Sequence, residues 1–167
     1  MKRFLIILIA FLISSTFLQA KDKTATSKYA GIYQFGKSVA ISSVKSVYVY
    51  PESDSTILIY ASIYTKAPSL NTGDIYVRIR ITNDTGSFYY VDSLTNDNKD
   101  TCSFNLKFSK EKLQIVSPDN CECHFGHNAF IQGDYKRISK KAPDYFIDML
   151  NRKNYFKSEK PENELSK

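Results

Sequence analysis

Strict alternation of apolar and polar residues constrains this chain more than any other feature. In the stretch DIYVRIRITN, residues 74–83, every second residue from Ile75 to Ile81 is isoleucine or valine. Successive side chains of a strand point to opposite faces, so the pattern predicts a strand with one dry face and one wet face. Residues 56–65 and 102–108 repeat the alternation. A helix would need a period near 3.6, which these stretches lack.

The same signal recurs along the chain and predicts an all-β fold. Turn sequences such as Asn83-Asp-Thr-Gly86 separate the alternating runs, and most connections are short, so sequential strands should pair antiparallel. We expect about eight strands in a meandering barrel over residues 29–138, with a two-sheet sandwich as the alternative. The 12 Tyr and 11 Phe residues suit half-buried pleated surfaces. The expected strands lie near 31–36, 40–50, 56–65, 74–83, 86–92, 101–108, 112–117 and 128–137.

The first 20 residues have the layout of a secretory signal peptide. Lys2 and Arg3 precede an apolar run, and Ala20 stands at the expected cleavage position. We therefore expect export to the periplasm or the extracellular space, without stable membrane insertion after cleavage. Loss of Lys2 and Arg3 lowers the formal net charge from +6 to +4. Because the basic residues are spread along the chain, we do not expect nucleic-acid binding.

The C-terminal region should behave differently from the barrel. Pro143 begins a stretch in which Tyr145, Phe146, Met149 and Leu150 are spaced by three and four residues, which predicts a helix over 142–153. Residues 157–167, KSEKPENELSK, are charged and lack apolar content, so we expect a disordered tail.

The stretch CECHFGH, residues 121–127, contains two of the three cysteines and both histidines. Cys121, Cys123, His124 and His127 offer a zinc-like ligand set, but Cys-x-Cys is tighter than usual zinc spacings, so a metal site is the weaker alternative. In an oxidising compartment a disulfide to Cys102 is expected first. Alternation alone does not decide which of the two cysteines pairs, and the leftover thiol could link two copies of the chain.

A family resemblance bears on that choice. Cys102 with its strand, then Cys123-His-Phe-Gly126-His-Asn, then Gly133-Asp-Tyr135-Lys resembles a pattern of small exported β proteins related to lysozyme-inhibitor-like domains of the bacterial envelope. The upstream Gly31-Ile-Tyr33 is similar to the opening of that family. The resemblance implies a Cys102–Cys123 disulfide and leaves Cys121 as a free thiol. Together with the signal-like start and the strand pattern, the resemblance favours a non-enzymatic barrel that binds a protein or small ligand, as a lysozyme inhibitor does.

Catalytic patterns are lacking, so we expect a non-enzymatic exported protein, without cofactor, that binds a protein or small ligand. No Gly-x-Ser-x-Gly elbow, phosphate-cradling loop or acid–base carboxylate pair occurs in the sequence. The alternative is a metal- or thiol-active envelope protein that uses the cluster at 121–127. The candidate binding residues are His124 and His127, which titrate near neutrality, and Arg78, Arg80 and Tyr76 on the wet face of a strand.

Overall fold

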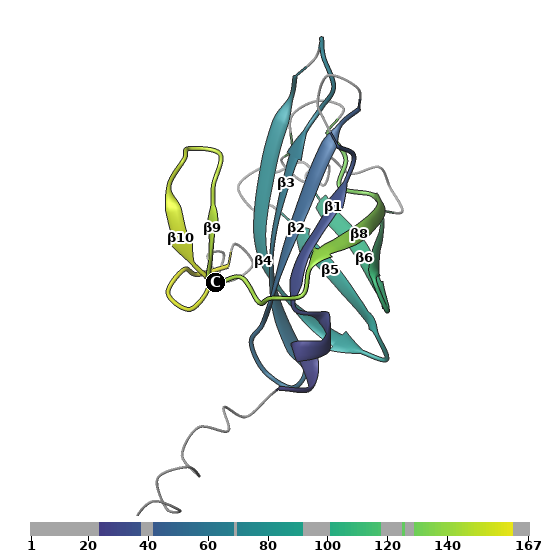
Figure 1. The fold of residues 1–167 in the computed structure, drawn as a ribbon, viewed down its shortest axis with the longest axis vertical. Coiled ribbons are helices and arrows are strands. Elements are labelled where there is room, and N and C mark those ends of the chain that lie inside the picture. Colours follow the sequence, from purple (N-terminus) through teal and green to yellow (C-terminus); the bar gives the residue numbers. More distant parts are fainter. Residues whose placement is uncertain are drawn as a thin grey trace, which may run out of the picture.

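The computed structural model describes residues 24–37, 42–68, 70–91, 101–117, 125 and 129–161. Ten strands and one short 3₁₀ helix occur in these residues, and eight of the strands form a closed antiparallel barrel in chain order (Figure 1). The barrel prediction is thus confirmed, and the sandwich alternative is wrong. The elements are η1 (Ala25–Tyr29), β1 (Gly31–Phe35), β2 (Val44–Pro51), β3 (Thr56–Tyr64), β4 (Thr72–Thr82), β5 (Thr85–Val91), β6 (Thr101–Ser109), β7 (Lys112–Val116), β8 (Gly133–Ser139), β9 (Tyr145–Ile147) and β10 (Lys153–Tyr155).

Local sequence sets the tight connections of the barrel. Asn83 and Asp84 join β4 to β5 with φ values of 51° and 62°, and Thr82 pairs directly with Thr85. Two positive φ values in a two-residue loop match the turn geometry that the strand twist of a hairpin favours, and Asn and Asp tolerate it well. The predicted turn at 83–86 is confirmed.

The barrel closes where β1 pairs with β8, and a glycine makes this seam possible. Gly31 has φ +140°, and a Cβ atom there would lie within van der Waals overlap of the Ser139 carbonyl oxygen. The register also shifts between Ile32 and Tyr33, which marks a bulge. Closure removes the two exposed strand edges that an open sheet would present.

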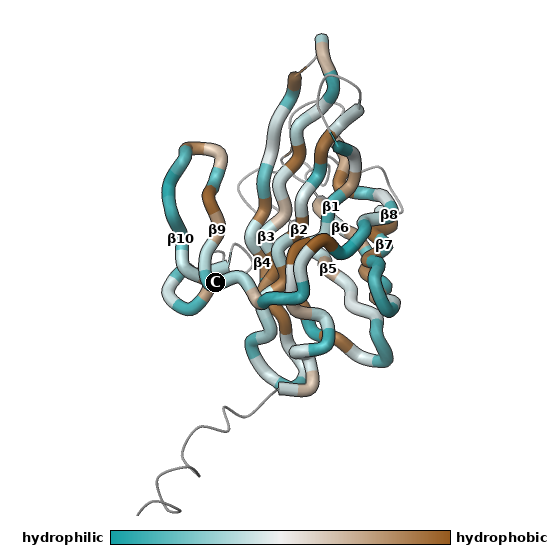
Figure 2. Tube along the Cα trace, viewed as in Figure 1, coloured by the Kyte–Doolittle hydropathy of each residue, from teal (hydrophilic) through white to brown (hydrophobic). Residues whose placement is uncertain are grey.

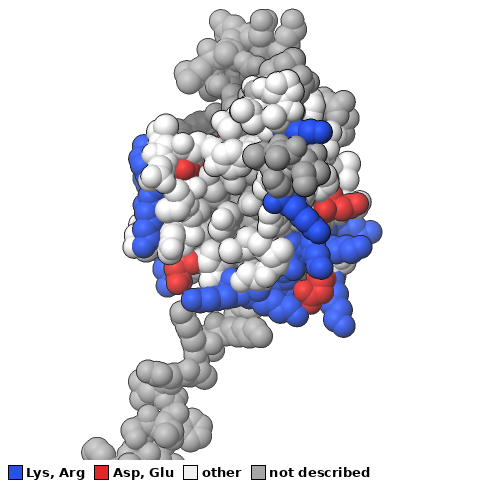
Figure 3. Space-filling model, turned by 45° about the horizontal axis from the view of Figure 1, so that its top comes forward, with Lys and Arg blue, Asp and Glu red and all other residues white. Residues whose placement is uncertain are grey.

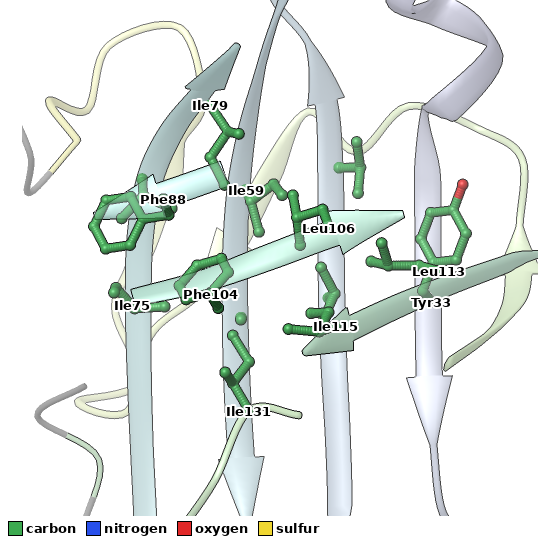
Figure 4. Close-up of a cluster of buried hydrophobic side chains, with 14 of the residues drawn as sticks. Tyr33, Ile59, Ile75, Ile79, Phe88, Phe104, Leu106, Leu113, Ile115 and Ile131 are labelled. Carbon is green, nitrogen blue, oxygen red and sulfur yellow. The ribbon is translucent and has the colours of Figure 1, made fainter. Parts of the chain in front are cut away.

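Inward side chains of the strands fill the barrel. Figure 4 shows side chains from opposite walls, such as Ile59 and Leu106, pointing toward one another. Figure 2 shows the corresponding alternation of hydrophobic and hydrophilic residues along the strands. Phe88 and Phe104 are cross-strand partners with ring centroids 5.0 Å apart. The fully buried large residues of the barrel core are Tyr33, Tyr135, Phe104, Ile57, Ile59, Ile63, Ile79, Leu106, Leu113, Ile115 and Ile131.

The η1 helix covers one end of the barrel. Its last residue, Tyr29, lies 4.6 Å from Phe108 between ring centroids, and its hydroxyl donates to Asp84 Oδ1 at 2.6 Å. Tyr33 Oη donates to the Tyr29 carbonyl at 2.9 Å. Ala25 N donates to Asp54 Oδ1 at 2.8 Å, so the helix is tied to two different inter-strand turns.

The opposite end is filled by the segment that leads into β8. Phe125, Ala129 and Ile131 are all buried within the barrel core. The inward-facing Lys45 donates to the Gln132 carbonyl at 2.6 Å, and burial lowers its pKa. The described residues thus cover both ends of the barrel and fill its interior.

The predicted helix over 142–153 is wrong. Residues 145–147 and 153–155 form the hairpin β9–β10, which lies outside the barrel (Figure 1). The Asp148 side chain holds its loop, because Oδ1 accepts hydrogen bonds from the amides of Leu150 and Arg152 at 3.0 and 2.8 Å. Asn151 adopts φ +61°, which ends any helical path.

Of the tail expected to be disordered, residues 157–161 belong to the described part. There the amide of Ser158 donates to the Tyr155 carbonyl at 3.0 Å. Residues 162–167 lie outside it, as does the expected signal peptide at 1–20. Within the described ranges, no helix is long and apolar enough to cross a membrane.

Candidate functional site

Large aromatic side chains gather on the outer wall of β2, β3 and β4. Leu58, Tyr60 and Tyr76 are buried although they point away from the barrel core, and Tyr48 and Tyr50 are half-buried beside them. We call these five residues the outer aromatic patch. They form cross-strand neighbours, because Tyr60 pairs with Tyr48 on one side and with Tyr76 on the other. A row of aromatic side chains on the outside of a barrel would expose apolar surface to water. Another segment of the same chain covers this row.

The β9–β10 hairpin is that cover, and two phenylalanines carry the contact. Phe146 stacks on Tyr60 with ring centroids 4.1 Å apart at 14°, and it lies 4.9 Å from Tyr76. Phe156 stacks on Tyr50 at 5.4 Å and 8°. Both phenylalanines are at most 4% exposed. Their burial removes most of the patch from water.

Polar contacts fix the position of the hairpin. The Tyr76 hydroxyl donates to the Phe156 carbonyl at 3.0 Å. The Tyr60 hydroxyl lies 3.0 Å from both the Asp74 Oδ2 atom and the Ile147 carbonyl oxygen. The amide of Met149 donates to the same Asp74 oxygen at 3.2 Å. Burial raises the pKa of both tyrosines, so their hydroxyls stay protonated at neutral pH.

A groove of about 370 Å³ lies where the chain passes from β8 to β9 over the barrel wall. We call it the hairpin groove. Its barrel side is made by Ile32, Tyr48 and Ser139, and its other side by residues 141–147. Lys141 and Asp144 are exposed at its rim, whereas Phe146 is buried at its base. An apolar, aromatic hollow with a few charged groups at the edge is typical of a small binding site.

A smaller hollow of about 200 Å³ lies on the other side of Phe146. It is more polar, with Asp74, Asp148 and Arg152 among its lining residues. The Arg152 Nε atom donates to Asp148 Oδ2 at 2.7 Å, so these two charges already satisfy each other. The hairpin groove is therefore the better candidate for an external ligand.

Metal binding and acid–base chemistry both depend on titratable side chains. The described residues contain no group of three or more His, Cys, Asp or Glu side chains that could hold a metal ion. The carboxylates with lowered pKa values are Asp84, Glu111 and Asp148, each of which accepts a hydrogen bond from a basic partner. A carboxylate with a lowered pKa is a poor general acid or base near neutral pH.

Three of the predicted binding residues lie on the outer face of β4, as expected. Tyr76 is only 5% exposed, because the hairpin covers its ring. Arg78 forms a two-point ion pair with Glu52, with Nε–Oε2 and Nη2–Oε1 distances of 2.6 and 2.5 Å. Arg80 is exposed to solvent. The structure thus brings Tyr76 into a docked interface and leaves Arg80 accessible.

Of the cysteines and histidines of the chain, only Cys102 lies among the described residues. Cys102 in β6 is 1% exposed and is not a free thiol in the structure. Its candidate partners, Cys121 and Cys123, lie outside the described residues, as do His124 and His127. The choice of disulfide partner, the leftover thiol and the metal alternative therefore stay predictions.

Sequence reasoning missed the hairpin groove because it assigned a helix to the residues that build it. A signal for the hairpin was present, since Tyr145-Phe-Ile147 and Lys153-Asn-Tyr155 are short aromatic runs separated by Asp148 and Asn151. Asp and Asn at such positions favour a turn.

No protein-family model, curated protein or solved structure matches this chain. The resemblance to lysozyme-inhibitor-like domains therefore rests on the quoted residues alone. What the molecule binds has to be inferred from the shape and charge of its own surface.

Proposed function

We propose that this protein is a non-enzymatic, exported envelope protein that binds an apolar or aromatic group of a protein or small ligand in the hairpin groove. The groove itself carries the proposal. Its volume of about 370 Å³ suits a side chain or a small ring system, and typical ligand pockets begin near 300 Å³. The covered barrel ends favour a site on the outer wall.

The lining residues favour an occupant with an apolar body and a polar end. Tyr48 and Phe146 provide aromatic surface, and Ala142 and Pro143 provide a rigid apolar edge. Lys141 and Asp144 can pair with either end of a polar group at the rim. An N-acetylated tyrosine or leucine amide is a minimal probe of this chemistry.

Two-dimensional amide NMR of the full exported chain tests the site. N-acetyl-tyrosine amide should shift the amide signals of residues 142, 144–147 and Tyr48. Ala142→Arg fills the groove without removing the Phe146 contact, so it should abolish these shifts. Ser109→Arg on the far wall is the matched control and should leave them unchanged. The proposal is wrong if millimolar probe moves no groove signal, or moves them equally in Ala142→Arg.

Lysozyme inhibition is the sharper version of the same proposal, and the sequence resemblance is its support. A panel of lysozymes assayed with and without the protein tests it directly. Full lysozyme activity in the presence of excess protein would remove the inhibitor version and leave the groove proposal standing.

Export and a Cys102–Cys123 disulfide belong to the proposal as well. The signal-like first 20 residues and the buried position of Cys102 support them. The intact mass of the unreduced protein should match a chain that begins at Lys21 and is two hydrogen atoms lighter than the reduced form. Peptide mapping then identifies the partner of Cys102. A fully reduced exported protein would contradict the disulfide.

A further inference from the structure

The wall formed by β6, β7 and β8 carries a concentration of positive charge. Residues 101–117 and 133–141 contain seven basic and two acidic side chains, whereas the other described residues contain ten and seven. Figure 3 shows Lys and Arg most densely at the lower right of the molecule, with further basic residues along its left and lower edges; β6 and β8 lie on the right in Figure 1. We call the outward residues Lys107, Lys112, Val116, Lys136, Ile138 and Lys140 the basic wall.

Strand pairing places these cations next to one another. Lys112 of β7 is the direct cross-strand partner of Lys136 of β8. Lys107 pairs with Gln114, two residues from Lys112, so it is the diagonal neighbour of Lys112. Like charges directly opposite each other destabilise a sheet. Folding alone gives no reason for this arrangement, whereas an anionic partner does.

The acidic residues nearby leave most of this charge uncompensated. Glu111 pairs with Lys140 at 2.7 Å, and Asp134 accepts a hydrogen bond from Gln114 at 3.1 Å. Among the described residues, Lys107, Lys112 and Lys136 form no ion pair. All three are exposed.

Exposed apolar side chains share this wall with the lysines. Ile138 is 58% exposed and Val116 is 49% exposed. Cations beside apolar groups suit the interface of a lipid bilayer, where lysines meet headgroup phosphates and short aliphatic chains enter the headgroup region. A soluble polyanion would use the lysines but would give no role to Ile138 and Val116.

We propose that the basic wall docks the protein reversibly, and without insertion, onto a membrane surface rich in anionic phospholipid. The basic wall and the hairpin groove lie on different strands and meet only at the end of β8. Membrane docking is therefore independent of ligand binding in the hairpin groove. Each lysine near an anionic bilayer should strengthen binding about fivefold, and salt should screen the attraction.

Co-sedimentation of the full exported chain with vesicles tests this proposal. We expect binding to phosphatidylglycerol-containing vesicles at low salt, little binding to pure phosphatidylcholine vesicles, and release in about 0.5 M salt, where the screening length falls to a few ångströms. The double variant Lys112→Gln/Lys136→Gln should bind about 30-fold more weakly. Lys157→Gln/Lys160→Gln removes the same charge far from this wall and should bind normally.

The stability of the double variant and the binding of the protein to other partners test the proposal further. The Lys112→Gln/Lys136→Gln variant should unfold at the same urea concentration or higher, because it removes a like-charge pair. Equal loss of binding in both double variants would overturn the assignment to this wall, as would equal binding to neutral vesicles. Absence of vesicle binding at low salt, or tighter binding to a short DNA duplex than to vesicles, would overturn the choice of a lipid partner.

Discussion

Replacing Phe146 by alanine removes the ring on which docking of the hairpin most depends. That ring is 4% exposed and contacts Tyr60, Tyr76 and Phe156, with centroid separations of 4.1, 4.9 and 5.1 Å. Truncation of a buried phenylalanine costs about 3–5 kcal/mol. If this loss falls on docking alone, the ratio of docked to undocked hairpin drops by about 100-fold to about 4,000-fold.

The loss should fall on the hairpin and not on the barrel. β9 and β10 pair only with each other and form a sheet separate from the barrel. An isolated two-stranded hairpin is marginal in water, so an undocked one should open. Trypsin should then cleave Phe146→Ala rapidly after Arg152 and Lys153, while urea unfolding of the barrel followed by circular dichroism changes little.

Tyr145→Ala is the matched control, because Tyr145 is the neighbour of Phe146 on β9 but is 43% exposed. It should be cleaved at close to the wild-type rate. The reasoning is refuted if Phe146→Ala and Tyr145→Ala are cleaved at the same rate. It is also refuted if the barrel itself loses 3 kcal/mol or more in Phe146→Ala, since the hairpin would then be part of one cooperative unit.

Three further predictions test other parts of the structure. Gly73→Ala should lower the unfolding free energy by about 1–3 kcal/mol in urea titration, because the added Cβ would lie within 3 Å of three Phe125 atoms. An unchanged unfolding midpoint would contradict the packing of Phe125 on β4. Burial raises the pKa of Tyr33 to about 12, so the folded state holds this proton more tightly than the unfolded chain. The resulting stability is complete below pH 10 and falls as pH rises from 10 through 12. The difference in tyrosinate absorbance at 295 nm between the wild type and Tyr33→Phe should therefore develop only with unfolding. Glu52→Gln should cost about 0.2–1 kcal/mol, since the ion pair with Arg78 is partly exposed, and a loss well above this range would show a stronger pair.

Strand positions follow from sequence with good accuracy because alternation reports a physical constraint. β4 and β7 each bury one face, and Leu113 and Ile115 alternate with exposed residues as the pattern requires. The start of the eighth strand was placed near 128 but lies at Gly133, since Ala129 and Ile131 enter the barrel end instead of pairing. Alternation cannot distinguish a paired strand from an extended segment that fills a barrel mouth.

The helix prediction over 142–153 failed for a reason that the contacts make plain. Spacings of three and four residues place Tyr145, Phe146, Met149 and Leu150 on one side of a helix, yet Leu150 is 71% exposed and Tyr145 is 43% exposed. Only Phe146 is buried, together with the distant Phe156. The extended form is favoured by hydrogen bonds that Asp148 accepts from amides of its own loop and by those that Tyr60 and Tyr76 donate to carbonyls of the hairpin. These partners are far away in sequence, so local pattern could not reveal them.

The barrel wall at β2–β4 and the barrel wall at β6–β8 nevertheless differ in a way that is visible in the sequence. β3 reads TILIYASIY, almost continuously apolar, and it is buried on both faces; β7 reads KLQIV and alternates between buried and exposed. A strand that is apolar on both faces implies a second layer over the sheet. The composition of β3 therefore indicates that another segment covers the wall at β2–β4. The charged outer face of β6–β8 indicates that the wall there does not need to be covered by the same chain. What sequence cannot supply is the identity of the cover, because Phe146 and Phe156 lie 70 or more residues from Tyr50, Tyr60 and Tyr76, the residues on which they pack.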